Sequence, residues 1–93
     1  MNYGAPHGVL LFFKRGKNWS REDRTAYLAA QTAFYGQLQQ QGKVLQTSRL
    51  VHEDGLFVSL SILSDTELSI ILANDPAIQA EVSQVIHAVP VTF

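Results

Sequence analysis

Few residues in this sequence have the types and spacing that chemistry requires. His7, His52 and His87 are dispersed and lack the spacing of metal ligands, so the sequence predicts no metal and no cofactor. His7 and His52 fall in a predicted leader and beside a predicted turn, where side chains are normally exposed. His87 is in strand phase with Val85 and Val89, which predicts an inward-facing core histidine or pocket residue. No phosphate-cradling glycine loop, HExxH or GxSxG motif is present.

Two further side chains, Asp75 and Gln31, are candidates for a site. Asp75 precedes Pro76, and this pair predicts the N-cap of a short helix. A catalytic role for Asp75 requires a partner in space, which the spacing does not identify. Gln31 lies in a stripe of helical spacing whose other members are apolar or aromatic: Tyr27, Phe34, Tyr35 and Leu38. A carboxamide in the middle of a core-facing stripe is the most informative local feature of the sequence.

Arg49 and Trp19 each have a simple structural interpretation beside a functional one. Arg49 is a charge inside a predicted strand, where it is either a solvated edge residue or the partner of a carboxylate. Trp19 immediately precedes a predicted helix cap, where an indole usually anchors the helix start. Neither residue defines a site by itself.

The bulk properties predict one small domain spanning residues 1–93, with a loose leader at 1–8. Seven Lys and Arg against eight Asp and Glu give a net charge of −1, which argues against a nucleic-acid binder. The absence of cysteine excludes disulfides and thiolate sites and fits a reducing compartment. No apolar run approaches the ~20 residues that span a bilayer, and no secretion signal is evident. We therefore expect a cytoplasmic protein without a membrane partner.

The hydrophobic periodicity predicts six main elements. They are a strand at 9–13, a helix at 20–41, strands at 43–51 and 56–63, a helix capped at 64 that stops at 74, and a last strand from 81 or 82 to 93. Ser20 is the predicted cap of the first helix, and Gly42 the residue that ends it. Asp54-Gly55 predicts a hairpin turn between the second and third strands. This order predicts an α+β, ferredoxin-like βαββαβ protomer: a four-stranded antiparallel sheet with two helices on one face.

The other face of such a sheet needs a cover. The first strand is apolar on both faces, and so are parts of the third and fourth. Ninety-three residues leave no further element to cover that face. A second copy of the same chain, packed sheet on sheet, is the economical solution, so we expect a homodimer.

With these residues in view, the chain resembles the YCII-related family of the dimeric α+β barrel superfamily. The resemblance extends from about Val9 to Phe93. The segments that carry it are Arg15-Gly16-Lys17-Asn18-Trp19, then 34–45, then 64–67 followed by 72–76 with its Asp75-Pro76 pair, and His87-Ala88-Val89-Pro90-Val91. It implies a ferredoxin-like protomer, a barrel-like homodimer and a small pocket that holds a histidine and an aspartate as an acid/base pair.

This chain retains one half of that pair. The family's aspartate corresponds to Asp75, whereas its histidine, eleven residues before the glycine that ends the helix, corresponds to Gln31. A carboxamide only donates and accepts hydrogen bonds. General acid/base catalysis is typically worth ~10²–10⁴-fold, so the loss of the histidine should sharply reduce such an activity. Ser48-Arg49 stands where family members often have Gly-Pro lining the pocket. Arg49 could fill the pocket, pair with Asp75 or recognise an anionic ligand.

Three functional hypotheses follow. The first is a homodimeric small-molecule-binding or accessory protein that has lost the acid/base pair. The second is a small enzyme of the lyase, isomerase or dehydrochlorinase kind, acting on cyclic or aromatic compounds, with Asp75 working alone or with Tyr27, Tyr35 or His87. The third is a structural dimerisation module. Candidate pocket residues are Gln31, Tyr27, Ser48, Arg49, Arg15, Trp19 and His87, with Asp75 as the catalytic candidate.

Overall fold

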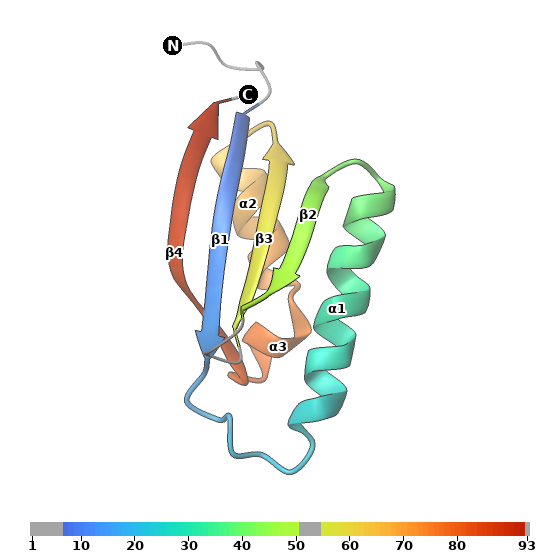
Figure 1. The fold of residues 1–93 in the computed structure, drawn as a ribbon, viewed down its shortest axis with the longest axis vertical. Helices are drawn as coiled ribbons and strands as arrows, with labels where there is room; N and C mark the ends of the chain where they lie inside the picture. Colours follow the sequence, from blue (N-terminus) through green and yellow to red (C-terminus); the bar gives the residue numbers. More distant parts are fainter. Residues whose placement is uncertain (1–6, 51–54, 93) are drawn as a thin grey trace.

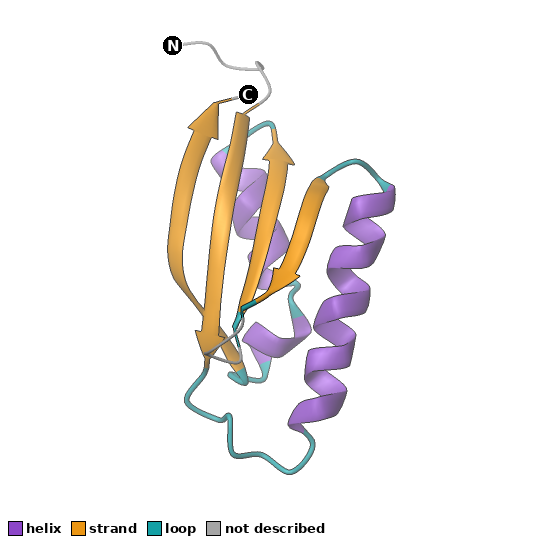
Figure 2. Ribbon diagram, viewed as in Figure 1, coloured by secondary structure: helices purple, strands orange, loops and turns teal. Residues whose placement is uncertain are grey.

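The computed structural model describes residues 7–50 and 55–92 and has the predicted α+β, ferredoxin-like architecture (Figure 1). Its elements are β1 (His7–Arg15), α1 (Arg24–Gln40), β2 (Val44–Arg49), β3 (Leu56–Ile62), α2 (Asp65–Ala73), the single turn α3 (Pro76–Gln79) and β4 (Ser83–Thr92). The strands form one sheet in the order β2-β3-β1-β4, and every neighbouring pair is antiparallel. In Figure 2, α2 and α3 lie behind the sheet and α1 runs alongside β2.

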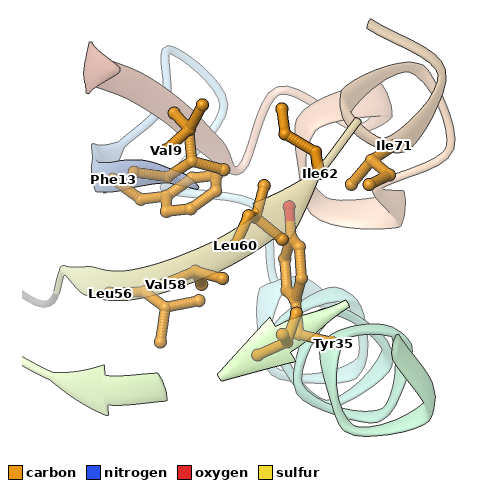
Figure 3. Close-up of a cluster of buried hydrophobic side chains, with 10 residues drawn as sticks. Val9, Phe13, Tyr35, Leu56, Val58, Leu60, Ile62 and Ile71 are labelled. Atoms are coloured by element: carbon orange, nitrogen blue, oxygen red, sulfur yellow. The ribbon is translucent and has the colours of Figure 1, made fainter. Parts of the chain in front are cut away.

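Strand alternation divides the sheet into a helix-covered face and an open face. On the covered face, Val9, Leu11 and Phe13 of β1 are buried, together with Leu56, Val58, Leu60 and Ile62 of β3. Figure 3 shows Tyr35 reaching from α1 into this cluster and Ile71 contributing from α2. Burial of these apolar side chains fixes both helices on the same face. Phe12 and Phe57, which point the other way, are only half-buried.

The structure confirms the predicted caps of the short elements. Each cap depends only on neighbouring residues, so the sequence is sufficient to predict it. Ser64 Oγ accepts a hydrogen bond from the Glu67 amide at 3.2 Å at the start of α2. Asp75 caps α3, and Pro76 occupies the first turn. Gly42 has φ +79 just beyond α1, the left-handed conformation that favours glycine after a helix.

The start of α1 was predicted wrongly. The helix begins at Arg24, its N-cap is Asp23 without a side-chain capping bond, and Ser20 lies in the preceding turns. The segment before it is held against the chain that enters β4: Gly16 N donates to Val82 O and Asn18 N to Glu81 O, both at 2.9 Å. The N-cap therefore lies three residues later than predicted, after a segment that is tied to the chain entering β4. A Cβ at position 16 would overlap the Glu81 carbonyl, so this approach requires glycine.

His87 does not face inward, which corrects the prediction from strand phase. A register shift in the β1–β4 ladder between Phe12 and Phe13 pairs Phe12 with His87 and Phe13 with Val85. His87 and Val85 therefore lie on opposite faces of the sheet. His87 is exposed on the open face, edge-on to Phe12 with the ring centroids 6.3 Å apart.

Other boundaries differ slightly from those predicted. β1 begins at His7, so the last two residues of the predicted leader belong to the sheet. His52 and most of the predicted hairpin turn lie outside the described residues. Within the described ranges, no helix is long and apolar enough to cross a membrane, and no group of three or more His, Asp or Glu side chains could hold a metal ion.

Candidate functional site

Three buried polar side chains meet beneath α1. Gln31 and Tyr35 lie one turn apart on the core-facing side of α1, and Asp75 lies at the start of α3. Gln31 Nε2 donates to Asp75 Oδ2 at 3.0 Å, and the Tyr35 hydroxyl donates to the same oxygen at 2.7 Å. Gln31 and Tyr35 are each 1% exposed and Asp75 is 0% exposed. We call these three residues the polar cluster.

The Asp75 carboxylate has a full set of hydrogen-bond donors. While Oδ2 accepts from Gln31 and Tyr35, Oδ1 accepts from the backbone amides of Ala77 and Ile78 at 2.9 and 3.1 Å. A carboxylate has about four acceptor sites, so four donors saturate it. The bonds from Gln31 and Tyr35 tie α1 to α3, the two amide bonds cap α3, and together they leave no acceptor position of Asp75 for a substrate proton.

Gln31 is only half satisfied. Its Nε2 faces Asp75, but its Oε1 has no hydrogen-bond partner among the described residues and is buried. The reverse orientation of the amide would place a carbonyl against the carboxylate, which is unfavourable. An unpaired buried carbonyl typically costs ~1–3 kcal/mol. The amide therefore keeps its contact with Asp75 at the expense of this acceptor.

Tyr35 is a weaker acid in this environment than an exposed tyrosine. Burial raises the pKa of its phenol, and the adjacent Asp75 carboxylate raises that pKa further by charge and by hydrogen bonding. The hydroxyl thus stays protonated through the neutral and moderately alkaline range.

This raised pKa links stability to pH. A pKa that is higher in the folded than in the unfolded chain stabilises the protein fully below the unfolded value, about 10 for tyrosine, and this stability is lost as the pH rises above it. We expect Tyr35→Phe to lower the free energy of unfolding by about 1–3 kcal/mol at neutral pH and to flatten its decline above pH ~10. Urea denaturation over a pH series measures both effects. Tyr27→Phe is the matched control and should keep the wild-type decline; a Tyr35→Phe profile parallel to wild type would contradict the assignment.

The other predicted candidates near α1 lie apart from the polar cluster. The Tyr27 hydroxyl accepts from Arg21 Nη2 at 3.3 Å, at an exposed position. Trp19 is half-buried, and the Arg15 and Arg24 guanidinium groups lie 4.9 and 5.6 Å from its ring centroid. These residues anchor the loop before α1, which is the simple interpretation of Trp19.

Neither second-strand candidate is among the hydrogen-bond partners of Asp75. Arg49 lies on the helix-covered side at the edge strand β2, where its Nη2 donates to Thr32 Oγ1 of α1 at 3.0 Å. Ser48 pairs with Phe57 on the open face. Of the three possible partners of Asp75, the structure brings Tyr35 to the carboxylate, while Tyr27 contacts Arg21 and His87 contacts Phe12. The spacing of four residues between Tyr35 and Gln31 was the signal that could have singled Tyr35 out.

Sequence comparisons assign no family to this chain: no family model matches it, and neither does any curated protein. A solved structure is similar in fold, that of 5-chloro-2-hydroxyhydroquinone dehydrochlorinase (TftG) from Burkholderia phenoliruptrix AC1100 in complex with 2,5-dihydroxybenzoquinone. The TM-score is 0.54 at 14% sequence identity, and the match covers 91% of this chain and 92% of the other. This likeness establishes a shared fold.

Proposed function

We propose that this chain is a YCII-like, homodimeric small-molecule-binding or accessory protein that has lost the family's acid/base pair. The single observation that carries this proposal is the saturated Asp75 carboxylate, whose side-chain donors are Gln31 and Tyr35. Protonating Asp75 would break one of four hydrogen bonds. Gln31 does not act as an acid or a base at ordinary pH, and the raised pKa of Tyr35 keeps its hydroxyl protonated, so the polar cluster has no group that relays a proton.

The homodimer would form through the open face of the sheet. Six side chains there are apolar or aromatic and at least partly exposed: Leu10, Phe12, Phe57, His87, Val89 and Val91. In the described strands, Lys14 is the one Lys, Arg, Asp or Glu side chain on this face, and it lies near an end of β1. A broad, nearly uncharged apolar surface supports the packing of a second copy, sheet on sheet.

An activity assay tests the loss of acid/base chemistry. Chloride release from 5-chloro-2-hydroxyhydroquinone is measured for wild type and for Asp75→Asn, which keeps the shape of the side chain. We expect no turnover by wild type above that of Asp75→Asn. Turnover by wild type that Asp75→Asn abolishes would overturn the proposal.

Binding is tested separately by thermal shift with a panel of small hydroxylated cyclic compounds. A ligand that binds only the folded chain raises its melting temperature in proportion to concentration over Kd. We expect at least one compound to stabilise the protein. A panel without effect would favour a structural dimerisation module instead.

One observation favours a second candidate, an enzyme acting on small cyclic or aromatic compounds. The Tyr35 hydroxyl lies 2.7 Å from Asp75, within the range of a proton-transfer pair. The neighbour of similar fold is a dehydrochlorinase, which suggests such substrates by analogy of fold alone. This candidate requires a ligand to reach a fully buried carboxylate, and the chloride assay distinguishes it from the first. A cytoplasmic location remains part of the proposal.

A further inference from the structure

A groove of about 470 Å³ runs between the C-terminal half of α1 and α2. Its volume is within the range of ~300–1,000 Å³ that is typical of small-molecule sites. Asp75 and Gln31 do not line it. It adjoins the polar cluster through its Phe34 wall, because the Phe34 and Tyr35 rings meet edge-on with their centroids 5.0 Å apart.

The walls of the groove are largely apolar. Phe34 and Leu38 of α1 face Ile70 and Ile71 of α2, and Ile71 is buried in the core cluster. Ile70, by contrast, is 57% exposed, one of the few large apolar side chains that the helix-covered side presents to water. A ligand that covers Ile70 and Phe34 would remove apolar surface from water, at roughly 25 cal/mol per Å².

An ion pair gives the groove a polar end. Lys43 Nζ lies 3.1 Å from Glu67 Oε1, and the two side chains are 42% and 21% exposed. The two charges balance each other, so a charged group on a ligand would be attracted by one of them and repelled by the other. A hydroxyl group, however, both donates and accepts, so it can donate to the Glu67 carboxylate and accept from the Lys43 ammonium.

We propose that this groove binds a neutral, largely apolar ring compound whose hydroxyl group contacts Glu67 and Lys43. The proposal rests on the proposed small-molecule-binding function and gives that function a place and a ligand class. The rings lie between Phe34 and Ile70, and the hydroxyl lies at the ion pair. No bond is made or broken in the ligand.

Titration with 2-naphthol, followed by backbone amide NMR shifts, tests the site on the full chain. We expect the largest shifts in the second half of α1 and along α2. Glu67→Gln should weaken binding about tenfold, because it removes the charge from one hydrogen bond. Ile70→Glu should abolish binding by placing a charge on the apolar wall. Leu63→Glu is the matched control, because Leu63 is 60% exposed and does not line the groove. This variant should bind 2-naphthol as wild type does.

The possible outcomes distinguish a failure of the groove proposal from a failure of the proposed small-molecule-binding function. If 2-naphthol binds the Ile70→Glu and Glu67→Gln variants as tightly as wild type, the groove is overturned as the site, whereas small-molecule binding stands. A wild-type chain that does not bind 2-naphthol overturns the groove proposal, and the thermal-shift panel then decides the function separately. If Ile70→Glu lowers the oligomeric state, the groove is an interface between copies and the proposal is wrong.

Discussion

Asp75→Ala is expected to lower the free energy of unfolding by about 3–5 kcal/mol, from the loss of a helix cap and the stranding of two buried donors. The Gln31 amide and the Tyr35 hydroxyl would both lose their shared acceptor inside the core. Small domains are typically stable by only ~5–15 kcal/mol, so the variant should be close to unfolding at room temperature. Urea denaturation followed by circular dichroism measures the change.

Two variants make this result specific. Asp75→Asn keeps Oδ1 as the cap, and a turned Gln31 amide can accept from the new Nδ2 with its Oε1, so we expect a much smaller loss. Asp23→Ala is the matched control at the N-cap of α1, where the aspartate makes no side-chain capping bond, and it should change the urea midpoint little. If Asp75→Ala loses no more stability than Asp23→Ala, Asp75 does not anchor α3 to α1.

Phe12→Glu is expected to convert the proposed homodimer to a monomer. Phe12 lies on the open face, with the Phe57 ring centroid 5.2 Å from its own and the His87 ring, nearly perpendicular to it, on the neighbouring strand at its other side. A two-fold interface would bury the new carboxylate twice, at ~2 kcal/mol or more each, which weakens dimerisation by roughly 10³-fold. Sedimentation equilibrium over a dilution series measures the dissociation constant.

Folding must be separated from association in this experiment. Val89→Glu offers a second test on the same face, because Val89 is 43% exposed in the single chain, so a polar side chain there should not disturb folding. Ile70→Glu, on the helix-covered side, should leave the dimer intact. A wild-type chain that sediments as a monomer at micromolar concentration would show that the open face is not a self-interface. Folded, dimeric Phe12→Glu and Val89→Glu variants would have the same meaning.

Elements governed by near neighbours could be predicted from the sequence. The Ser64 and Asp75 caps and the left-handed Gly42 each depend on residues within one turn, so their chemistry is visible in the chain itself. The alternation of Leu56, Val58, Leu60 and Ile62 in the sequence likewise indicates the buried face of β3. The order of these elements was sufficient for the α+β, ferredoxin-like fold, because few topologies bury their apolar faces in that order.

Contacts between distant segments were decided by the tertiary structure alone. Asp75 lies 44 residues from Gln31 and 40 from Tyr35, and only the packing of α3 under α1 brings their polar atoms together. The register shift that turns His87 to the open face leaves no mark in the alternation of β4. The sequence by itself determined that Gln31 would face the core and that Asp75 would cap a helix. The contact between Gln31 and Asp75 depends on how the helices pack, which periodicity does not encode. Because of this packing, the Asp75 carboxylate is saturated with hydrogen-bond donors and has no acceptor site for a substrate proton.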